Sequence, residues 1–362
     1  MPALVDAVTE RGVKLRIAQV APLWTTIPPR TYGGIELLMK LLIDELVARG
    51  HEVTLFASAD CVTAARLHPV VETNLTELMT DGKCYCYEHY VNSMMAEVLA
   101  AQAHFDVVHF HMSSAWLPLA AAMKTAALFT MHTSPHHDDE WAMRRWPRVA
   151  VNGISRCQMR ATGLRLAREF PIVHNGCDFA SYDASFAKGQ YLAFLGRLSP
   201  EKNPLGAIQI ARACGLPIVL AGAPMNASES RYFEAEIKPH IDGDQVRWVG
   251  GVNHAQKNGL LRNAAALLFP IQWEEPFGLV MIEAMACGTP VVAHRRGSVE
   301  EVVDTGITGF HASVLDALPE LVPQALGLDR ASVRAHAETR FGFHAMVDAY
   351  EALYRSEADR AR

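Results

Sequence analysis

The sequence predicts an α/β protein built from two doubly wound, Rossmann-like domains. Its 362 residues exceed the size of one ordinary hydrophobic core, and 50% of them are apolar, which provides enough buried surface for two sheets. Short β-branched runs alternate with helical periods in the first half, and this alternation begins afresh at Tyr191. We therefore expect a first domain at 1–185, a second domain at 186–340 and a C-terminal segment at 341–362.

The first domain opens with a β-α-β unit. Residues 15–22 form a short apolar run typical of a buried strand, apolar positions at helical spacing fill 35–49, and 52–57 provide a second strand. Helical or polar stretches separate the strand-like runs that follow, at 107–111, 127–132, 149–154 and 172–175. The first half is therefore predicted to be an α/β domain.

The second domain repeats this pattern. Its expected strands lie at 191–197, 217–221, 246–249, 266–269 and 290–293, with helices that begin near Asn203, Ser228, Asn253 and Gly278. Apolar residues at helical spacing over 343–354 need a surface to cover, and we expect this last helix to return to the first domain. Because doubly wound sheets bind ligands beyond the carboxyl ends of their strands, both sheets should face one interdomain cleft.

Charge and cysteine content exclude several classes of protein. The 33 Lys and Arg residues against 39 Asp and Glu give a net charge of −6, so we expect no nucleic-acid partner. Seven cysteines without framework spacing favour thiols in a reducing cytosol. The chain has neither an apolar run of about 20 residues nor a signal-peptide core. We expect a cytoplasmic protein whose contact with the inner face of the cell membrane is peripheral at most.

The most informative segment pairs two acidic residues with the start of a helix. Pro276 keeps Glu275 out of helical geometry, and Gly278 opens a helix whose free amide groups suit a phosphate. Glu283 lies further along that helix, where it can accept hydrogen bonds from ribose hydroxyls. Taken alone, each acid is as often a helix cap or a solvated residue as it is a ligand-binding group. Together, they predict binding of a sugar nucleotide.

The order of the motifs resembles that of the retaining glycosyltransferases of family 4. The segments that carry the resemblance are FLGRLSPEKN at 194–203, EPFGL at 275–279 followed by Glu283, GTPVVA at 288–293, GSVEE at 297–301 and GITG at 306–309. The resemblance extends over nearly the whole chain and implies the two-domain GT-B fold. It also implies that Arg197 and Lys202 hold the donor diphosphate, where fixed cations can stabilise the leaving group without a metal.

Glycines at the start of the first helix are expected on the other side of the donor. The segment YGGIE at 32–36 lets backbone amides approach a phosphate closely, although such glycines alone are equally typical of a plain turn. Family members place this loop near the donor phosphates and the acceptor. The donor-binding residues that we expect are Gly33, Gly34, Arg197, Lys202, Glu275, Phe277, Gly278, Leu279 and Glu283.

Histidines and aromatic residues of the first domain are candidates for the remaining contacts. In the family, the residue that aligns with His111 lies against the donor sugar, and catalysis is expected to involve His111, Arg197, Lys202 and Glu275. His132, Trp24 and Tyr32 are acceptor candidates, because aromatic faces stack on sugar rings. A zinc site among the histidines is an alternative, but the sequence lacks Cys or carboxylate partners at ligand spacing. We therefore expect no metal.

The resemblance implies a retaining transferase that moves a hexose from a nucleoside diphosphate sugar, a UDP-sugar or GDP-sugar, to a hydroxyl group of a saccharide, a lipid-linked sugar or a small molecule. The resemblance implies front-face attack without metal or other cofactor. A nucleotide-sugar 2-epimerase of the same fold is an alternative. A nicotinamide-dependent oxidoreductase is disfavoured because no G-x-G-x-x-G follows 15–22 or 191–197. A non-catalytic glycan-binding protein is a further alternative, and unlike a transferase it would not consume the donor sugar in the presence of an acceptor. The arginine-rich segment 144–168 is either a contact for an anionic acceptor or lipid, or a solvated surface.

Overall fold

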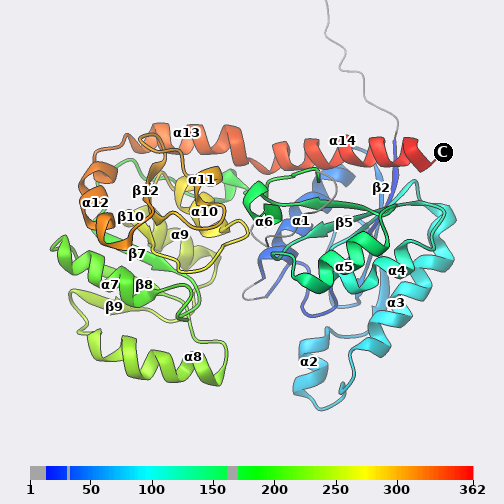
Figure 1. The fold of residues 1–362 in the computed structure, drawn as a ribbon, viewed down its shortest axis with the longest axis horizontal. Coiled ribbons are helices and arrows are strands. Elements are labelled where there is room, and N and C mark those ends of the chain that lie inside the picture. The colour runs from blue at the N-terminus through cyan, green and yellow to red at the C-terminus, as the bar shows by residue number, and fades with distance from the viewer. Residues whose placement is uncertain (1–13, 31–32, 161–169, 362) are drawn as a thin grey trace, which may run out of the picture.

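The computed structural model describes residues 14–30, 33–160 and 170–361 and consists of two α/β domains (Figure 1). The first contains a six-stranded sheet of order β3-β2-β1-β4-β5-β6 with only parallel pairs. Its strands are β1 (Arg16–Val20), β2 (Glu52–Ser58), β3 (Arg66–Val71), β4 (Val107–Phe110), β5 (Ala126–Met131) and β6 (Ala150–Gly153). Its helices are α1 (Gly34–Ala48), α2 (Leu75–Thr80), α3 (Glu88–Ala101), α4 (Leu117–Ala120), α5 (His137–Arg145) and α6 (Arg156–Arg160).

The second domain has the same topology. Its parallel sheet has the order β12-β11-β10-β7-β8-β9, which repeats the first order from the opposite edge. The strands are β7 (Tyr191–Leu195), β8 (Ile218–Ala221), β9 (Val246–Trp248), β10 (Ala264–Phe269), β11 (Val291–His294) and β12 (Gly309–Ala312). The helices are α7 (Pro204–Ala213), α8 (Ala227–Tyr232), α9 (His254–Asn263), α10 (Leu279–Ala286), α11 (Val299–Val302), α12 (Leu318–Leu326) and α13 (Arg330–Phe341).

Each sheet separates two hydrophobic clusters, as a doubly wound fold requires. In the first domain, one cluster joins the sheet to α1 and to the last helix, α14 (Phe343–Ala361), and the other joins it to α3, α4 and α5. Leu38, Leu42 and Leu46 are fully or nearly buried and recur every fourth residue, so one face of α1 covers the sheet. In the second domain, α9, α10 and α13 share one cluster, while α7 and α12 share the other.

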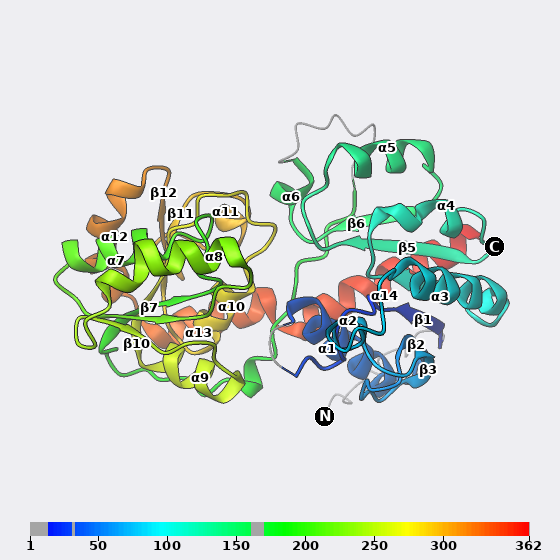
Figure 2. The ribbon, with the colours of Figure 1, turned by 90° about the horizontal axis from the view of Figure 1, so that it is seen from below.

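The chain connects the domains twice, at neighbouring points. The Cys177 amide donates to the Phe341 carbonyl group at 2.8 Å, and the Phe343 amide donates to the Cys177 carbonyl group at 3.0 Å. From there α14 passes back over the first domain, where Tyr350 and Tyr354 are buried (Figures 1 and 2). The predicted return of the last helix is confirmed. The two crossings therefore lie side by side and are joined by backbone hydrogen bonds.

Most predicted strands are present, with three differences. The prediction of a strand at 172–175 is wrong, because this segment makes only an isolated bridge between Ile172 and Gly153 before it leaves for the second domain. The strands β3 and β12 were not predicted. The expected boundary near residue 185 stays a prediction, although Phe179 and Tyr182 already pack in the second core.

All seven cysteines are free thiols, and Cys61, Cys84, Cys177 and Cys287 are buried. Burial raises the pKa of the Cys177 and Cys287 thiols, which keeps both protonated at neutral pH. Within the described ranges, none of the helices has the length and apolar character that a membrane span needs.

Candidate functional site

The residues singled out in the sequence follow the central strands of the two sheets. Arg197 and Lys202 follow β7 and Glu275 follows β10, while Gly34 and His111 follow β1 and β4. In each sheet, these two strands are the neighbours at which the strand order reverses. Ligands of doubly wound sheets bind at this switch point. Both domains therefore contribute the part of the sheet that is best suited to a ligand.

A largely buried ion pair lies at the switch point of the second domain. The Lys202 ammonium group donates to Oε2 of Glu275, and the two side chains are 16% and 11% exposed. Trp273 Nε1 donates to the same oxygen at 2.9 Å, and the Lys202 ammonium group lies 4.9 Å from the centroid of the Trp273 ring. A cation–π contact and two charge-assisted hydrogen bonds thus fix all three side chains.

Backbone contacts between loops bring this ion pair together. The Gln272 amide donates to the Glu201 carbonyl group at 2.8 Å, which ties the loop after β10 to the loop after β7. Behind Glu275, the Ser298 amide donates to its carbonyl group at 2.9 Å. Gly297 has a φ of 56°, and a Cβ atom there would lie 2.2 Å from the Glu275 backbone. The glycine of the GSVEE motif therefore permits the close approach that places Glu275.

Arg197 is held by two carboxylates. Its guanidinium group donates to Glu229 at 2.8 Å and to Glu201 at 2.9 Å. Glu229 is 5% exposed and also accepts from the Met225 amide at 2.7 Å, so that its own position is fixed. A guanidinium group has five N–H donors, and these two ion pairs leave others that can bind a phosphate. The carboxylates hold Arg197 in place and at the same time offset its charge.

The first turns of α1 and α10 meet across the domain boundary. Gly33 caps α1, and Gly278, with a φ of 77°, caps α10. A Cβ atom on Gly34 would lie 3.0 Å from Cδ1 of Leu279, so this glycine lets the two helix starts approach each other. The first amide groups of a helix have no partner within it, and its N-terminus carries partial positive charge. Two such N-termini at one point suit an anion.

Glu283, in the middle of α10, is 9% exposed and has two partners from other segments. The Tyr182 hydroxyl donates to Glu283 Oε1 at 3.1 Å, and the Lys257 ammonium group donates to the same oxygen. Burial, followed by the charge of Glu283, raises the pKa of Tyr182, so the phenol keeps its proton and remains a donor. The other carboxylate oxygen is left for a further donor such as a hydroxyl group.

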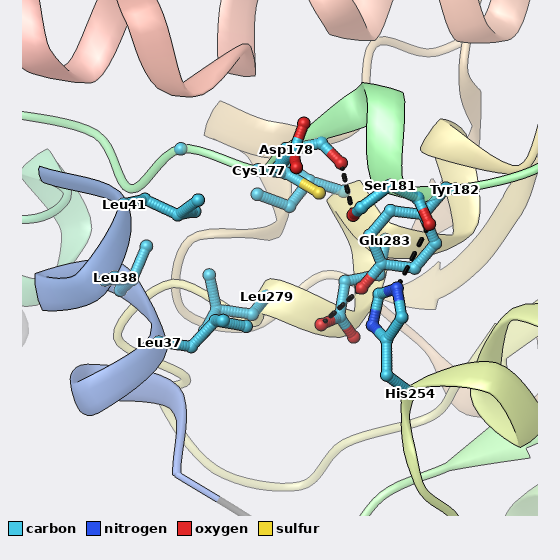
Figure 3. Close-up of a pocket in the computed structure, with 12 residues that line it drawn as sticks. Leu37, Leu38, Leu41, Cys177, Asp178, Ser181, Tyr182, His254, Leu279 and Glu283 are labelled. Atoms are coloured by element: carbon cyan, nitrogen blue, oxygen red, sulfur yellow. Dashed lines mark hydrogen bonds between the residues drawn. The ribbon is translucent and has the colours of Figure 1, made fainter. Parts of the chain in front are cut away.

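A cavity of about 240 Å³ lies beside Glu283, between α1 and the second domain (Figure 3). Leucines of α1 form one wall, Leu279 lies between the domains, and polar groups from the second domain form the opposite wall. The lining residues are Leu37, Leu38, Leu41, Gly176, Cys177, Asp178, Ser181, Tyr182, His254, Leu279, Ile282 and Glu283. The cavity can therefore cover an apolar group next to a group that binds Glu283.

His111 belongs to a buried hydrogen-bond network in the first domain. Its Nε2 lies 2.9 Å from Gln19 Oε1, and its Nδ1 lies 2.9 Å from Nε2 of His132. Gln19 also donates to the Tyr354 hydroxyl at 2.9 Å, which connects the network to α14. Burial lowers the pKa of His111 well below its ordinary value and that of His132 to about 4, so both rings are neutral at pH 7. With both ring nitrogens of His111 engaged, its contact with a donor sugar stays a prediction.

Two other predicted residues, Phe277 and Trp24, lie in different surroundings. The Phe277 ring is 2% exposed and packs near His174 and Phe341, so only its backbone is placed to meet a ligand. Trp24 is 40% exposed, and its ring centroid lies 5.0 Å from that of Tyr87. Tyr32 lies outside the described residues. The acceptor roles of Trp24, Tyr32 and His132 stay predictions.

Several residues of this site were not predicted from the sequence. Lys257, Tyr182 and Glu229 come from loops and helices whose positions depend on tertiary packing, and nothing in their local sequence marks them. Trp273 lies two residues before Glu275, so its position next to the EPFGL segment was a signal that could have identified it. Glu36 in the first turn of α1 is 7% exposed, and burial raises the pKa of its carboxyl group.

Among the side chains with described positions, no group of three or more His, Cys, Asp and Glu could hold a metal ion.

Comparisons with known proteins agree with this arrangement. The family model described as Glycosyltransferase Family 4 matches residues 32–160, and the model described as Glycosyl transferases group 1 matches residues 183–332. The D-inositol 3-phosphate glycosyltransferase of Mycobacterium tuberculosis (strain F11) is 29% identical to this chain, and the match covers 89% of this chain and 78% of that protein. The phosphatidyl-myo-inositol mannosyltransferase of Mycolicibacterium smegmatis is 26% identical to this chain, and the match covers 84% of this chain and 82% of that protein.

A solved structure is similar over nearly the whole chain. The crystal structure of a glycosyltransferase involved in avilamycin A biosynthesis superposes with a TM-score of 0.72. The two sequences are 29% identical, and the match covers 95% of this chain and 98% of that one. The likeness therefore includes both domains.

Proposed function

This chain belongs to the glycosyltransferases of family 4 and has their two-domain GT-B fold, and on that basis we propose that it transfers a hexosyl group from a nucleoside diphosphate sugar to a hydroxyl group, with retention of anomeric configuration. The observation that carries the proposal is the Lys202–Glu275 pair at the end of β7 and β10. It combines a fixed cation with a fixed carboxylate in a site that also contains the N-terminus of α10.

The donor contacts follow from the chemistry of each group. Glu283 accepts hydrogen bonds from the ribose hydroxyls through the carboxylate oxygen that Lys257 and Tyr182 do not use. The amide groups at Gly278 and Gly34 bind the diphosphate from the two domains. Glu275 accepts hydrogen bonds from hydroxyls of the transferred sugar and orients its anomeric carbon.

Lys202 and Arg197 stabilise the leaving group. A departing nucleoside diphosphate gains negative charge on the bridging oxygen, and a cation fixed in advance stabilises this charge without further reorganisation. In front-face attack, the acceptor hydroxyl approaches on the same side as the leaving phosphate, whose oxygen takes the hydroxyl proton. Bond formation on that face retains the configuration, and the protein contributes alignment and charge stabilisation. We propose that these two cations and the helix N-termini perform this role without a metal ion.

The acceptor binds on the first-domain side, near the loops that follow β1, β4 and β5. The names of both relatives contain an inositol compound, which is D-inositol 3-phosphate in one and phosphatidyl-myo-inositol in the other. We propose a polyol hydroxyl as the acceptor group and D-inositol 3-phosphate as the first compound to test. The neutral His132 ring lies at the end of β5, where it can hydrogen-bond a hydroxyl.

A thermal-shift panel of UDP-, GDP- and ADP-sugars tests the donor class. A donor present at 100 times its Kd stabilises the fold by about 2.7 kcal/mol. We expect one nucleotide series to raise the Tm and Glu283→Gln to lose this rise. Glu338→Gln, an exposed acid on α13, is the matched control and should keep it. If no nucleoside diphosphate sugar changes the Tm, the proposed function is wrong.

A further inference from the structure

Residues 155–158 contact two loops of the candidate site. One is the loop between β10 and α10, residues 270–278, which carries Glu275 and is called the donor loop below. The other is the loop between β5 and α5, residues 132–136, which is called the His132 loop. The Ser155 hydroxyl donates to the Pro276 carbonyl group at 2.6 Å, and Pro276 is the residue after Glu275. The contact crosses from the first domain to the second. Ser155 is fully buried and Gln158 is 1% exposed, so these groups have no ready access to water.

Gln158 extends the same connection towards the acceptor side. Its backbone amide donates to the Ser155 hydroxyl at 2.9 Å, and its side-chain oxygen accepts from the Ile154 amide at 2.8 Å. Its side-chain amide group donates to the carbonyl groups of Met131 at 2.6 Å and Thr133 at 2.8 Å. These two residues flank His132. Both N–H donors of Gln158 are therefore used to hold the backbone on either side of one candidate acceptor residue.

Glu301, from the second domain, secures this turn. Its carboxylate accepts from the Arg156 amide at 2.8 Å and from the Cys157 amide at 2.5 Å, and it lies 3.3 Å from His174 Nε2. Glu301 ends the GSVEE motif, whose Gly297 and Ser298 contact the backbone of Glu275. The segment that supports the donor loop from behind is thus the same segment that holds the first-domain turn.

From these contacts we infer that residues 155–158 form a bridge that sets the position of the His132 loop relative to the donor loop. The inference rests on the proposed function, because it names positioning residues for that transfer: Ser155, Gln158 and Glu301. Leaving a buried donor or acceptor unpaired raises the free energy of the folded chain. These hydrogen bonds are therefore expected to form or break together rather than to stretch. A donor that orders Pro276 and its neighbours therefore also orders the backbone on both sides of His132.

A chain labelled with [13Cε1]-histidine tests the bridge. The His132 signal is assigned by its absence from the spectrum of His132→Gln, and UDP, GDP and ADP are added in turn. We expect the nucleotide that binds to shift this signal. Ser155→Ala should lose the shift while its nucleotide Kd stays close to that of the unaltered chain, because the proposed nucleotide contacts do not include Ser155. Gln158→Met, which keeps the side-chain length and removes both donors, should lose the shift as well.

Ser298→Ala is the matched control. The Ser298 hydroxyl is also fully buried and donates to the Phe277 carbonyl group at 2.7 Å, but both residues belong to the second domain. This variant should keep the His132 shift, although it loses the same kind of hydrogen bond to the next carbonyl of the donor loop. A shift that persists in Ser155→Ala, or that is lost equally in Ser298→Ala, would overturn the inference alone. Failure of all three nucleotides to bind the unaltered chain would overturn the proposed function and, with it, the inference.

Discussion

Replacement of Lys202 and Glu275, singly and together, separates the structural role of their ion pair from its role in transfer. Lys202→Met removes the ammonium group and keeps most of the side-chain length, and Glu275→Gln removes the charge at nearly constant volume. Each single variant leaves one charge without its partner in a site where the side chains are 16% and 11% exposed. Loss of one partner of a buried pair costs about 3 to 5 kcal/mol.

The lower end of that range applies to this pair, because both side chains keep some contact with solvent and Trp273 still donates to Glu275 at 2.9 Å in Lys202→Met. We expect each single variant to lose about 3 kcal/mol of unfolding free energy. The double variant leaves no unpaired charge and should lose less than either single variant. Because the double variant loses less than either single variant, the cycle then gives a coupling free energy of more than about 3 kcal/mol between the two residues.

Urea denaturation of the four proteins measures this coupling, and steady-state transfer rates are measured on the same samples. The unfolding free energy should recover in the double variant, because no unpaired charge remains. Turnover should not recover, because the leaving group still lacks the Lys202 cation and the transferred sugar still lacks the Glu275 carboxylate. Additive losses of stability would refute the ion-pair reasoning. Recovery of turnover in the double variant would refute the separate roles given to the two side chains.

Three further predictions concern other groups. Glu283→Ala should weaken binding of free UDP or GDP by about 1.5 to 3 kcal/mol in calorimetry, since a charged hydrogen bond to ribose is lost, and unchanged affinity would contradict this contact. Stability should fall from pH 7.5 to pH 5.0, because burial lowers the pKa of His132 to about 4 and only the unfolded chain takes up this proton in that range. The loss from this group is about 2 kcal/mol at pH 5, and urea denaturation of His132→Gln should show a correspondingly smaller pH dependence. Transfer should persist in excess EDTA, and a loss of activity that Mg²⁺ or Mn²⁺ restores would contradict charge stabilisation by Lys202 and Arg197.

The central strands of each sheet and one of its two edge strands, β6 or β9, could be predicted from the sequence, whereas the other edge strand could not. Strands such as β1 and β10 are short apolar runs because they are buried on both faces, and this pattern is readable. The missed strands β3 and β12 lie at the sheet edges, where most of their residues are partly exposed and their sequences mix polar and apolar residues. Ile172 and Val173 are apolar for a different reason, since Val173 packs in the cluster that contains α14.

The candidate site shows a similar division. The sequence indicates Glu275, Gly278 and Glu283 because they share one loop and helix, so their spacing reports their geometry. The partners of these residues come from distant segments, and no local pattern reports such a contact. Lys257, for instance, reaches Glu283 only because α9 packs beside α10. The engagement of both nitrogens of His111 likewise depends on the register of β1, β4 and β5 and on α14.

Proton NMR of the chain with an α-configured nucleoside diphosphate hexose and D-inositol 3-phosphate tests directly whether the chain transfers a hexosyl group with retention. The donor is chosen as the one that raises the Tm most. We expect the donor anomeric signal to disappear and a new α-glycosidic signal to grow, and neither change should occur with Lys202→Met or with Glu275→Gln. A β-configured product would contradict retention, and a donor that binds but stays intact with D-inositol 3-phosphate and other polyol acceptors would contradict transfer itself.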